Sequence, residues 1–376
     1  MSAPVKPAYT QVIEPRLPGR DRYLGGELCV KTGDLYCVPG SAQRVLKINP
    51  ETDEVSLIGP ELPGKFKWLR AVYCPNNGRL FSIPSCASQM LMIDPTTDEV
   101  RVYGDVGSEK WKWHGAMYSD IDECIYCIPC NAKQVLKIDT NTGDYEFIGP
   151  VFEQRLQWYG GFKDSNGCIY GVPNCADQVL KIDPSKGGEV TLFGDYPKGD
   201  YQWHGGVKDK KGIFYAVPSH AKQVLKIDPE NMTTTLIGDE IDPGLYRPKG
   251  KYKYGGSCLG DNGMIYCIPS DADRVLKIDT ENDTVKHIGP SFAMHNKWQN
   301  GYKARDGHIY GIPCNADGLL QIDCWNDEVN VLEIDESTKD GFEKWEGGVL
   351  DNNGGLWCVP QNAKVVLKVH PEEKAE

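Results

Sequence analysis

The sequence predicts an all-β fold, an eight-bladed β-propeller of four-stranded antiparallel blades, on the strength of two observations. The first is a repeated segment: Gln178-Val-Leu-Lys-Ile-Asp-Pro184 recurs with little change along the chain. Close copies begin at Gln134, Gln223 and Arg274, and looser copies begin at Arg44, Gln89, Leu319 and Val365. The second is that each copy lies in a unit of about 45 residues with four short β-type segments. A fixed period of about 20–50 residues indicates a repeat architecture.

The unit that begins at Trp203 shows how each element is predicted. Short runs rich in β-branched and aromatic residues are separated by Gly, Asp, Asn or Pro at every junction, which is typical of a β-meander. The four predicted strands cover residues 203–208, 213–217, 223–227 and 233–237. No helical period of 3.6 residues persists anywhere in the chain.

An aromatic-x-Gly-Gly motif at the start of the first strand sets the register. The repeats start near residues 23, 68, 113, 158, 203, 253, 298 and 345, with spacings of 45, 45, 45, 45, 50, 45 and 47. In the second copy Arg70-Ala71 replaces the glycine pair, and in the sixth copy Lys253 takes the aromatic slot. The longer fifth spacing falls in residues 239–252, which we expect to form a surface insertion.

The last repeat ends without a fourth strand, and the missing strand is found at the N-terminus. Residues 10–19 match residues 55–64, which form the fourth strand and exit loop of the first repeat. We therefore expect residues 9–14 to complete the eighth blade and remove an open sheet edge. Residues 1–376 are expected to form a single domain, and seven blades is the alternative count.

Composition narrows the class of protein. With 40% hydrophobic and 25% charged residues the chain is predicted to be globular, and no apolar run approaches a membrane span. A net charge of −12 argues against nucleic acid or an anionic membrane as the main partner. The N-terminus lacks the apolar core of a signal peptide, so we expect a cytoplasmic protein whose 14 cysteines are reduced.

The repeat also resembles a known class of propellers. The string Gly167-Cys-Ile-Tyr-Gly-Val-Pro173, followed by Val179-Leu-Lys-Ile-Asp-Pro184, resembles the repeat of NHL-type and virginiamycin B lyase-like propellers. The resemblance covers residues 23 to 370 and implies the propeller fold. The lyase-like repeat places Glu after the aromatic strand, whereas this chain has Pro in all eight copies, so the lyase activity is not expected to carry over. These are Pro39, Pro84, Pro129, Pro173, Pro218, Pro269, Pro313 and Pro360.

The most informative position is the x of the aromatic-x-Gly-Gly motif, because topology places it near the mouth of a central channel. Structural packing would favour one residue type there, but the chemistry varies from copy to copy. The eight residues are Leu24, Leu69, His114, Tyr159, His204, Tyr254, Gln299 and Glu346. If the side chains of His114, His204 and Glu346 converge, they form a metal or acid/base site; the alternatives are a ligand-contacting rim and a merely polar channel lining.

The slot before the aromatic residue is cationic in five of the eight copies. It holds Arg22, Lys67, Lys112, Gln157, Gln202, Tyr252, Lys297 and Lys344. One interpretation is a basic, aromatic lip for an anionic ligand or an acidic segment of a partner. The other is that solvated lysines flank structural tryptophans. The candidate binding residues are Lys67, Trp68, Lys112, Trp113, His114, Tyr159, His204, Tyr254, Gln299, Lys344 and Glu346.

Other candidates are weaker. The turn between the second and third strands holds variable polar residues that usually stabilise such turns, and only His220 and Asp271 stand out as a pair. Cys124, Cys127 and Cys130 belong to an ordinary strand of the repeat, so we expect no metal there. No phosphate-binding loop, dinucleotide fingerprint or nucleophile elbow is present, and no cofactor is expected.

These observations favour a non-enzymatic cytosolic scaffold that binds a protein partner through one basic, aromatic-lined face. The alternative is a small-molecule lyase or hydrolase in which His114, His204 and Glu346 act at the channel mouth. A small-molecule ligand in the channel is compatible with either hypothesis.

Overall fold

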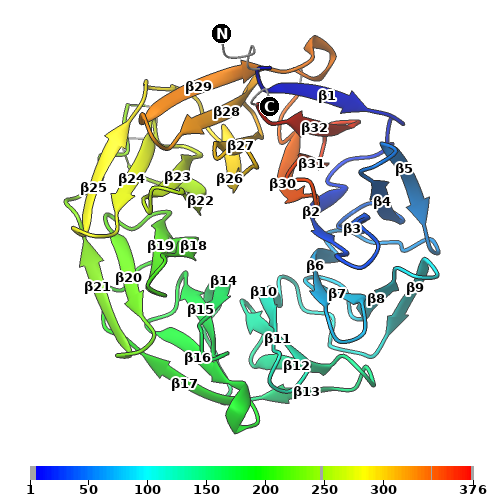
Figure 1. Ribbon diagram of the computed structural model, residues 1–376. Coiled ribbons are helices and arrows are strands. Elements are labelled where there is room, and N and C mark those ends of the chain that lie inside the picture. Colours follow the sequence, from blue (N-terminus) through cyan, green and yellow to red (C-terminus); the bar gives the residue numbers. More distant parts are fainter. Residues whose placement is uncertain (1–5, 246–248, 340, 374–376) are drawn as a thin grey trace.

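The computed structural model describes residues 6–245, 249–339 and 341–373, and in it eight four-stranded antiparallel sheets stand in a ring around a central axis (Figure 1). The predicted eight-bladed propeller is confirmed, and the seven-bladed alternative is wrong. Among the described residues no helix is long and apolar enough to cross a membrane.

The strands follow the predicted meander from the axis outwards. Blades 1 to 3 contain β2 (Tyr23–Leu28), β3 (Leu35–Pro39), β4 (Val45–Asn49), β5 (Glu54–Ile58); β6 (Trp68–Cys74), β7 (Arg79–Pro84), β8 (Met90–Asp94), β9 (Glu99–Tyr103); β10 (Trp113–Tyr118), β11 (Cys124–Pro129), β12 (Val135–Asp139), β13 (Tyr145–Ile148). Blades 4 to 6 contain β14 (Trp158–Lys163), β15 (Ile169–Pro173), β16 (Val179–Asp183), β17 (Glu189–Phe193); β18 (Trp203–Lys208), β19 (Phe214–Pro218), β20 (Val224–Asp228), β21 (Thr233–Ile237); β22 (Tyr254–Leu259), β23 (Ile265–Pro269), β24 (Val275–Asp279), β25 (Thr284–Ile288). Blades 7 and 8 contain β26 (Trp298–Lys303), β27 (Ile309–Pro313), β28 (Gly318–Asp323), β29 (Glu328–Glu333); β30 (Trp345–Leu350), β31 (Leu356–Pro360), β32 (Val366–His370) and β1 (Tyr9–Ile13). Two 3-10 turns, η1 (Pro184–Lys186) and η2 (Glu336–Thr338), follow β16 and β29.

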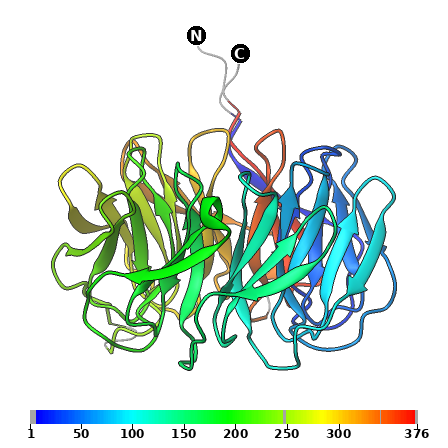
Figure 2. The ribbon, with the colours of Figure 1, turned by 90° about the horizontal axis from the view of Figure 1, so that it is seen from below.

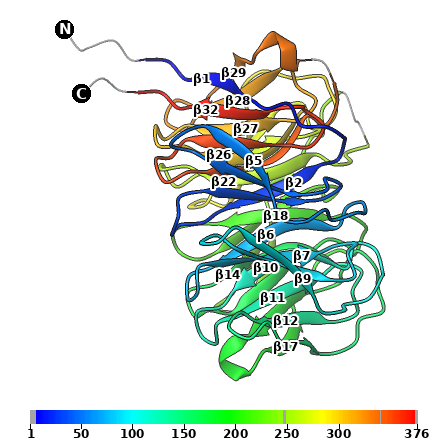
Figure 3. The same cartoon turned by 90° about the vertical axis from the view of Figure 1, so that its right-hand side faces the viewer.

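The ring is closed by the N-terminal strand, as the sequence predicts. β1 pairs antiparallel with β32, from Tyr9 opposite His370 to Ile13 opposite Val366 (Figure 3). Ile13 is buried in the cluster between blades 8 and 1. Two segments from opposite ends of the chain therefore complete one blade.

Deletion of residues 1–13 should open this blade. Loss of the Ile13 side chain and of the β1–β32 ladder is expected to lower the free energy of unfolding by about 2–3 kcal/mol, and the exposed β32 edge should promote self-association. Urea denaturation and light scattering measure the two effects. Deletion of residues 1–5, which leaves β1 in place, should change neither; equal behaviour of the two deletions would contradict this role for β1.

The Val-Leu-Lys-Ile-Asp repeat has a structural explanation. In β24, Val275, Leu276 and Ile278 are fully buried, because alternate side chains point to opposite faces of a blade and each face packs on a neighbouring blade. The lysine of the same strand reaches the next blade: Lys277 Nζ lies 2.6 Å from an Asp327 carboxylate oxygen. Equivalent pairs are Lys47–Asp98, Lys226–Asp283 and, across the ring closure, Lys368–Asp53.

The two flat faces of the disc differ in their loops (Figure 2). One face carries the loops that join the outer strand of each blade to the inner strand of the next, together with the turns between the second and third strands. We call this the mouth face. The prediction that these two kinds of loop lie on the same face is confirmed by hydrogen bonds between them. The His220 amide, for example, donates to the Tyr201 carbonyl at 2.9 Å.

The register of the sixth repeat differs by one residue from the prediction. Tyr254 pairs with Pro269 in the same way that Trp203 pairs with Pro218, so Tyr254 fills the aromatic slot and Lys253 precedes it. Tyr254 is 1% exposed, and its hydroxyl lies 3.1 Å from His287 Nε2. Its placement at the x position was wrong, because the insertion before this blade obscures the register; the x position is Gly255.

All fourteen cysteines are free thiols, and twelve of them are buried. Burial raises the pKa of the Cys37 and Cys267 thiols, which sit at the same place in their blades. They behave as small apolar side chains of the blade interfaces.

Candidate functional site

A β-bulge aims the x side chains at the axis. In seven of the eight blades the pairing between the first and second strands shifts directly after the aromatic residue: Trp203 pairs with Pro218, and the next pair is Gly206 with Ala216. In blade 7 the shift comes one residue later, after Gln299. Such a bulge re-aims the intervening side chain. All eight x residues consequently line one axial cavity of about 620 Å³, which we call the channel.

The lysines of the preceding slot do not form a basic lip. Lys67, Lys112, Lys297 and Lys344 are each at most 4% exposed. The Lys297 ammonium donates to the carbonyl oxygens of Ser270, Ala272 and Met294 at 2.8–2.9 Å. The other three make similar sets, as Lys67 does with Gly40, Ala42 and Gly64. Each set includes carbonyls of the preceding blade, so these ammonium groups connect neighbouring blades.

The exposed basic lip expected from Lys67, Lys112 and Lys344 is therefore not formed, because these side chains and the aromatic residues beside them are buried. Trp68 and Trp113 are 3% and 2% exposed, and their indole nitrogens donate to the carbonyls of Gln89 and Gln134 at 3.0 Å. The sequence pattern did not reveal that a lysine beside a buried indole bonds inward. Burial lowers the pKa of Lys67 and of Lys297 to about 8.

Three of the predicted side chains meet on one wall of the channel. The imidazole of His114 stacks on the Tyr159 ring, with centroids 3.3 Å apart, and Tyr159 meets the edge of His204 at 4.2 Å. The two imidazoles are 6.4 Å apart. Burial, together with the Arg70 charge, lowers the pKa of His204 to about 4, and burial, with the His204 and Arg70 charges, holds the pKa of His114 well below its usual value. Both imidazoles are neutral at physiological pH.

Two carboxyl groups lie on the opposite side of the channel. Burial raises the pKa of Glu346 in blade 8, and of Glu27 in blade 1, to about 7, although the Arg70 charge acts to lower both. Gln299, the remaining predicted channel residue, lines the same cavity and donates its amide to Asn296 Oδ1 and Ser270 Oγ.

Arg70 and Glu27 were missed as site residues, although the sequence carries a signal for each. Arg70 is the single charged residue in the glycine pairs of the eight motifs. Glu27 occupies a slot that is apolar or aromatic in the other seven copies, namely Val72, Met117, Phe162, Val207, Cys258, Tyr302 and Val349. Comparing repeats slot by slot identifies both.

The mouth face carries a second ring of residues, which we call the αL ring. Its eight members have left-handed φ angles of 47–58°, one per blade: Asp21, Phe66, Trp111, Leu156, Tyr201, Tyr252, Asn296 and Glu343. Such angles are unusual for large side chains. The turn residues considered above hold this conformation, since Asn131 Oδ1 accepts from the Leu156 amide at 2.9 Å and Asp271 Oδ1 from the Asn296 amide at 2.6 Å.

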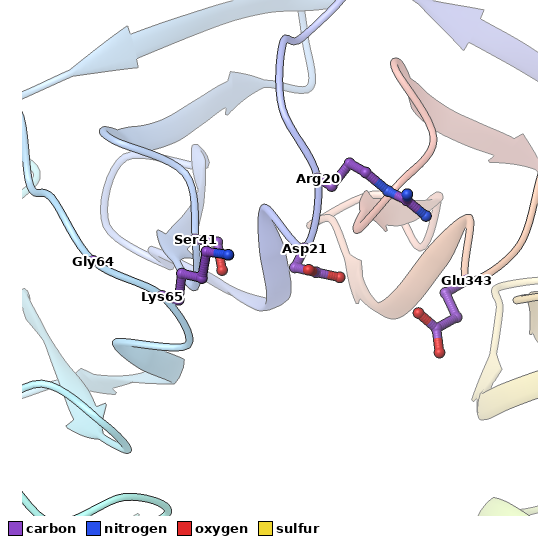
Figure 4. A pocket seen from close by; sticks show the side chains of 6 residues that line it. All are labelled: Arg20, Asp21, Ser41, Gly64, Lys65 and Glu343. Carbon is purple, nitrogen blue, oxygen red and sulfur yellow. The ribbon is translucent and has the colours of Figure 1, made fainter.

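The αL ring is divided into two sectors. From blade 2 to blade 6 it is apolar or aromatic; we call Phe66, Trp111, Leu156, Tyr201 and Tyr252 the aromatic arc. From blade 7 to blade 1 it is polar. There an open pocket of about 680 Å³ is lined by Arg20, Asp21, Ser41, Gly64, Lys65 and Glu343 (Figure 4). This pocket presents charges of both signs.

The catalytic alternative is only partly supported by this geometry. His114 and His204 converge on Tyr159, whereas Glu346 comes from the opposite side of the channel. Among the described residues no group of three His, Cys, Asp or Glu side chains has the geometry of a metal site. His220 packs against Tyr201 and Tyr252 on the mouth face, and Asp271 holds the backbone of the next blade.

Comparisons with known proteins agree with the fold. No protein-family model and no curated protein matches the chain. Among solved structures, Saccharomyces cerevisiae Sqt1 is similar, with a TM-score of 0.67 and 10% identity over 99% of this chain and 100% of that one. A streptogramin B lyase (TM-score 0.59, 10% identity, 96% of this chain and 97% of that one) and the Staphylococcus aureus virginiamycin B lyase (0.59, 11%, 96% and 99%) are also similar. These likenesses establish the fold. They confirm the resemblance to lyase-like propellers at the level of architecture.

Proposed function

We propose that this protein is a non-enzymatic cytoplasmic scaffold that binds a protein partner through the aromatic arc of the mouth face. The observation that carries the proposal is the arc itself, in which five large side chains on five successive blades stand in a strained backbone conformation at one rim. Two of the five, Trp111 and Tyr252, are exposed and the other three are half-buried, and apolar patches at a protein surface mark interaction sites. The fourteen free cysteines are consistent with a reducing compartment.

Side-chain exposure favours the mouth face over the opposite one. Among the described residues, six large exposed hydrophobic side chains lie in the loops of the mouth face and three in those of the other face. The six are Trp111, Val151, Leu245, Tyr252, Met294 and Phe342, and the three are Val30, Ile121 and Trp325.

Backbone strain at the arc also supports a role beyond packing. A bulky residue at positive φ costs of order 1 kcal/mol relative to glycine or asparagine. Blade 7 has Asn296 at the same place, with φ of 47°, so the fold does not need an aromatic residue there. Trp111 and Tyr252 are nevertheless 37% and 47% exposed. Strained, exposed aromatic residues of this kind are typical anchors for a partner.

The partner expected here is a protein segment with large apolar side chains followed by polar ones. The apolar side chains pack on the aromatic arc, where Phe66 and Trp111 lie 5.2 Å apart and Tyr201, His220 and Tyr252 form a second group. The polar part continues over the mixed-charge pocket at Asp21 and Glu343. This replaces the basic lip with an apolar contact, because the lysines are buried.

The double variant Trp111→Asn, Tyr252→Asn tests the proposal. Asparagine accepts the left-handed backbone, so the melting temperature should not fall, whereas partner affinity should drop by at least about 30-fold, or ~2 kcal/mol. The measurement is affinity capture from the native source with quantitative mass spectrometry, followed by titration of the captured protein.

The matched control is Trp325→Ala, which removes a 70% exposed tryptophan from the opposite face. A partner retained by Trp325→Ala and lost by the double variant supports the proposed face. A partner retained by both, or lost with Trp325→Ala alone, would show that the mouth face is not the binding surface.

A further inference from the structure

A single guanidinium stands inside the channel, where most blades have glycine. The Arg70 side chain lies across the backbone of blade 1, and a Cβ on Gly25 would come within 2.7 Å of Arg70 Cγ and 3.0 Å of Nε. Its terminal nitrogen reaches to 3.8 Å from the corresponding position on Gly347 in blade 8. The glycines of blades 1 and 8 thus make room for the arginine, which also lines the axial cavity.

Arg70 is not neutralised by an ion pair with another described residue. No carboxylate oxygen of these residues lies within 4 Å of its guanidinium nitrogens, although Glu27 and Glu346 line the same cavity. Burial raises the pKa of both carboxyl groups to about 7, although the Arg70 charge acts to lower both. The cation is therefore available to a ligand.

Other polar atoms in the cavity wall have no hydrogen-bond partner among the described residues. They include Gln361 Oε1, on a side chain that is only 7% exposed, His114 Nδ1 and Ser257 Oγ. Buried polar atoms are nearly always hydrogen-bonded in native proteins, and each exception calls for an explanation. These three come from blades 8, 3 and 6, so a ligand between them would lie near the axis.

The wall facing blades 8 and 1 is aromatic. The Tyr159 and His204 rings line the cavity and stand perpendicular to each other, and Phe66 and Trp111 line the same cavity from the loops of the mouth face. A cavity of about 620 Å³ accommodates a small planar molecule.

We propose that the channel binds a small aromatic carboxylate, whose carboxylate pairs with Arg70 and whose ring packs against Tyr159 and His204. Guanidinium binds carboxylate through two parallel hydrogen bonds, which fixes the orientation of the ligand. Gln361, Ser257 and His114 supply hydrogen bonds to polar substituents on the ring. The channel shares Phe66 and Trp111 with the aromatic arc, but the pairing of a ligand with Arg70 does not depend on a protein partner.

The proposal has a consequence for protons. Two carboxylates cannot share a site without one holding a proton, so binding of an anion beside Glu346 and Glu27 requires these side chains to be protonated. The other charged groups that act on Glu346 are Glu343 and Asp21, which raise its pKa further. The affinity for the anionic ligand should therefore rise as the pH falls from about 8 to about 6. At the upper end of this range, where the free carboxyl groups are ionised, ligand binding should be accompanied by proton uptake.

The test uses three probes of one shape and different charge: benzoate, benzamide and benzamidine. Isothermal titration calorimetry with the full chain should show that benzoate binds, with at least about tenfold higher affinity than benzamide. Arg70→Gln should abolish benzoate binding, whereas Arg101→Gln, on the outer strand of the same blade, should not change it. Titration in buffers of different ionisation enthalpy should show proton uptake.

Several outcomes would overturn the proposal. Preferential binding of benzamidine with proton release would mean that the glutamates, not Arg70, select the ligand. Equal binding of benzoate by wild type and Arg70→Gln would place the site elsewhere. Failure of all three probes to bind at millimolar concentration would also overturn it, as long as circular dichroism shows the wild-type chain to be folded.

Discussion

Replacement of Lys297 by glutamate is expected to unfold the protein or to lower its free energy of unfolding by more than about 4 kcal/mol. The Lys297 ammonium donates to three carbonyl oxygens at 2.8–2.9 Å inside the seam between blades 6 and 7. A carboxylate there would face the same oxygens without a donor and without water. Urea denaturation followed by tryptophan fluorescence measures the loss.

Two further variants separate the causes of that loss. Lys297→Met keeps most of the volume and removes the ammonium donor, and it should cost about 2–3 kcal/mol because three carbonyls lose that donor. Of the three, the Ser270 carbonyl still accepts from the backbone amide of residue 297 at 3.1 Å. Lys110→Glu changes the same charge on an exposed residue of the mouth face, and its effect should lie within about 0.5 kcal/mol. If Lys297→Glu lowered the free energy of unfolding as little as Lys110→Glu, the claim that buried Lys297 bonds to these carbonyls would be contradicted.

The fold could be predicted because it depends on residues that repeat. Val, Leu and Ile of the Val-Leu-Lys-Ile-Asp segment are buried in blade after blade, and turn residues mark every junction, so periodicity alone defines blade number and strand order. Closure by residues 9–14 was predicted because the N-terminus carries a copy of the fourth-strand sequence that the last repeat lacks. The pairing of β1 with β32 confirms this prediction.

The site could be predicted only in part, because side-chain direction is decided by three-dimensional contacts. From sequence, a lysine beside a tryptophan is predicted to be a solvent-exposed cation. Only the structure shows that Lys67 and Lys112 donate to carbonyls of the preceding blade. Tyr254 was misplaced because a one-residue ambiguity after an insertion changes which side chain points to the axis. In contrast, the prediction that x side chains point to the axis is confirmed, because a β-bulge in each blade directs them there. These side chains are His114, Tyr159, His204, Gln299 and Glu346, and all of them line the channel.

Residues that depart from the repeat indicate which positions serve a role other than blade architecture. In a ring of near-identical units, a residue that differs from its seven counterparts is not needed for blade architecture. Arg70, Glu27 and Glu346 are such residues, and all three line one side of the channel, whereas His114, Tyr159 and His204 line the other. Two of these groups, Glu27 and Glu346, cost folding free energy when ionised.

Substitution of Glu346 by glutamine should therefore stabilise the protein, and the gain should depend on pH. Burial raises the pKa of Glu346 from 4.5 to about 7 in the folded state. The stability that protonated Glu346 gives the wild type is then fully present below about pH 4.5 and is lost as the pH rises to about 7. The free energy of unfolding of the glutamine variant should therefore exceed that of the wild type by an amount that grows across this window to about 2–3 kcal/mol and stays level above it. Urea denaturation of wild type and variant at a series of pH values measures the difference directly, and the titration of His114 and His204 cancels in it. Glu99→Gln, an exposed carboxylate of blade 2, should show no such trend, and a pH-independent difference for Glu346→Gln would mean that Glu346 is hydrated in the channel like a surface residue.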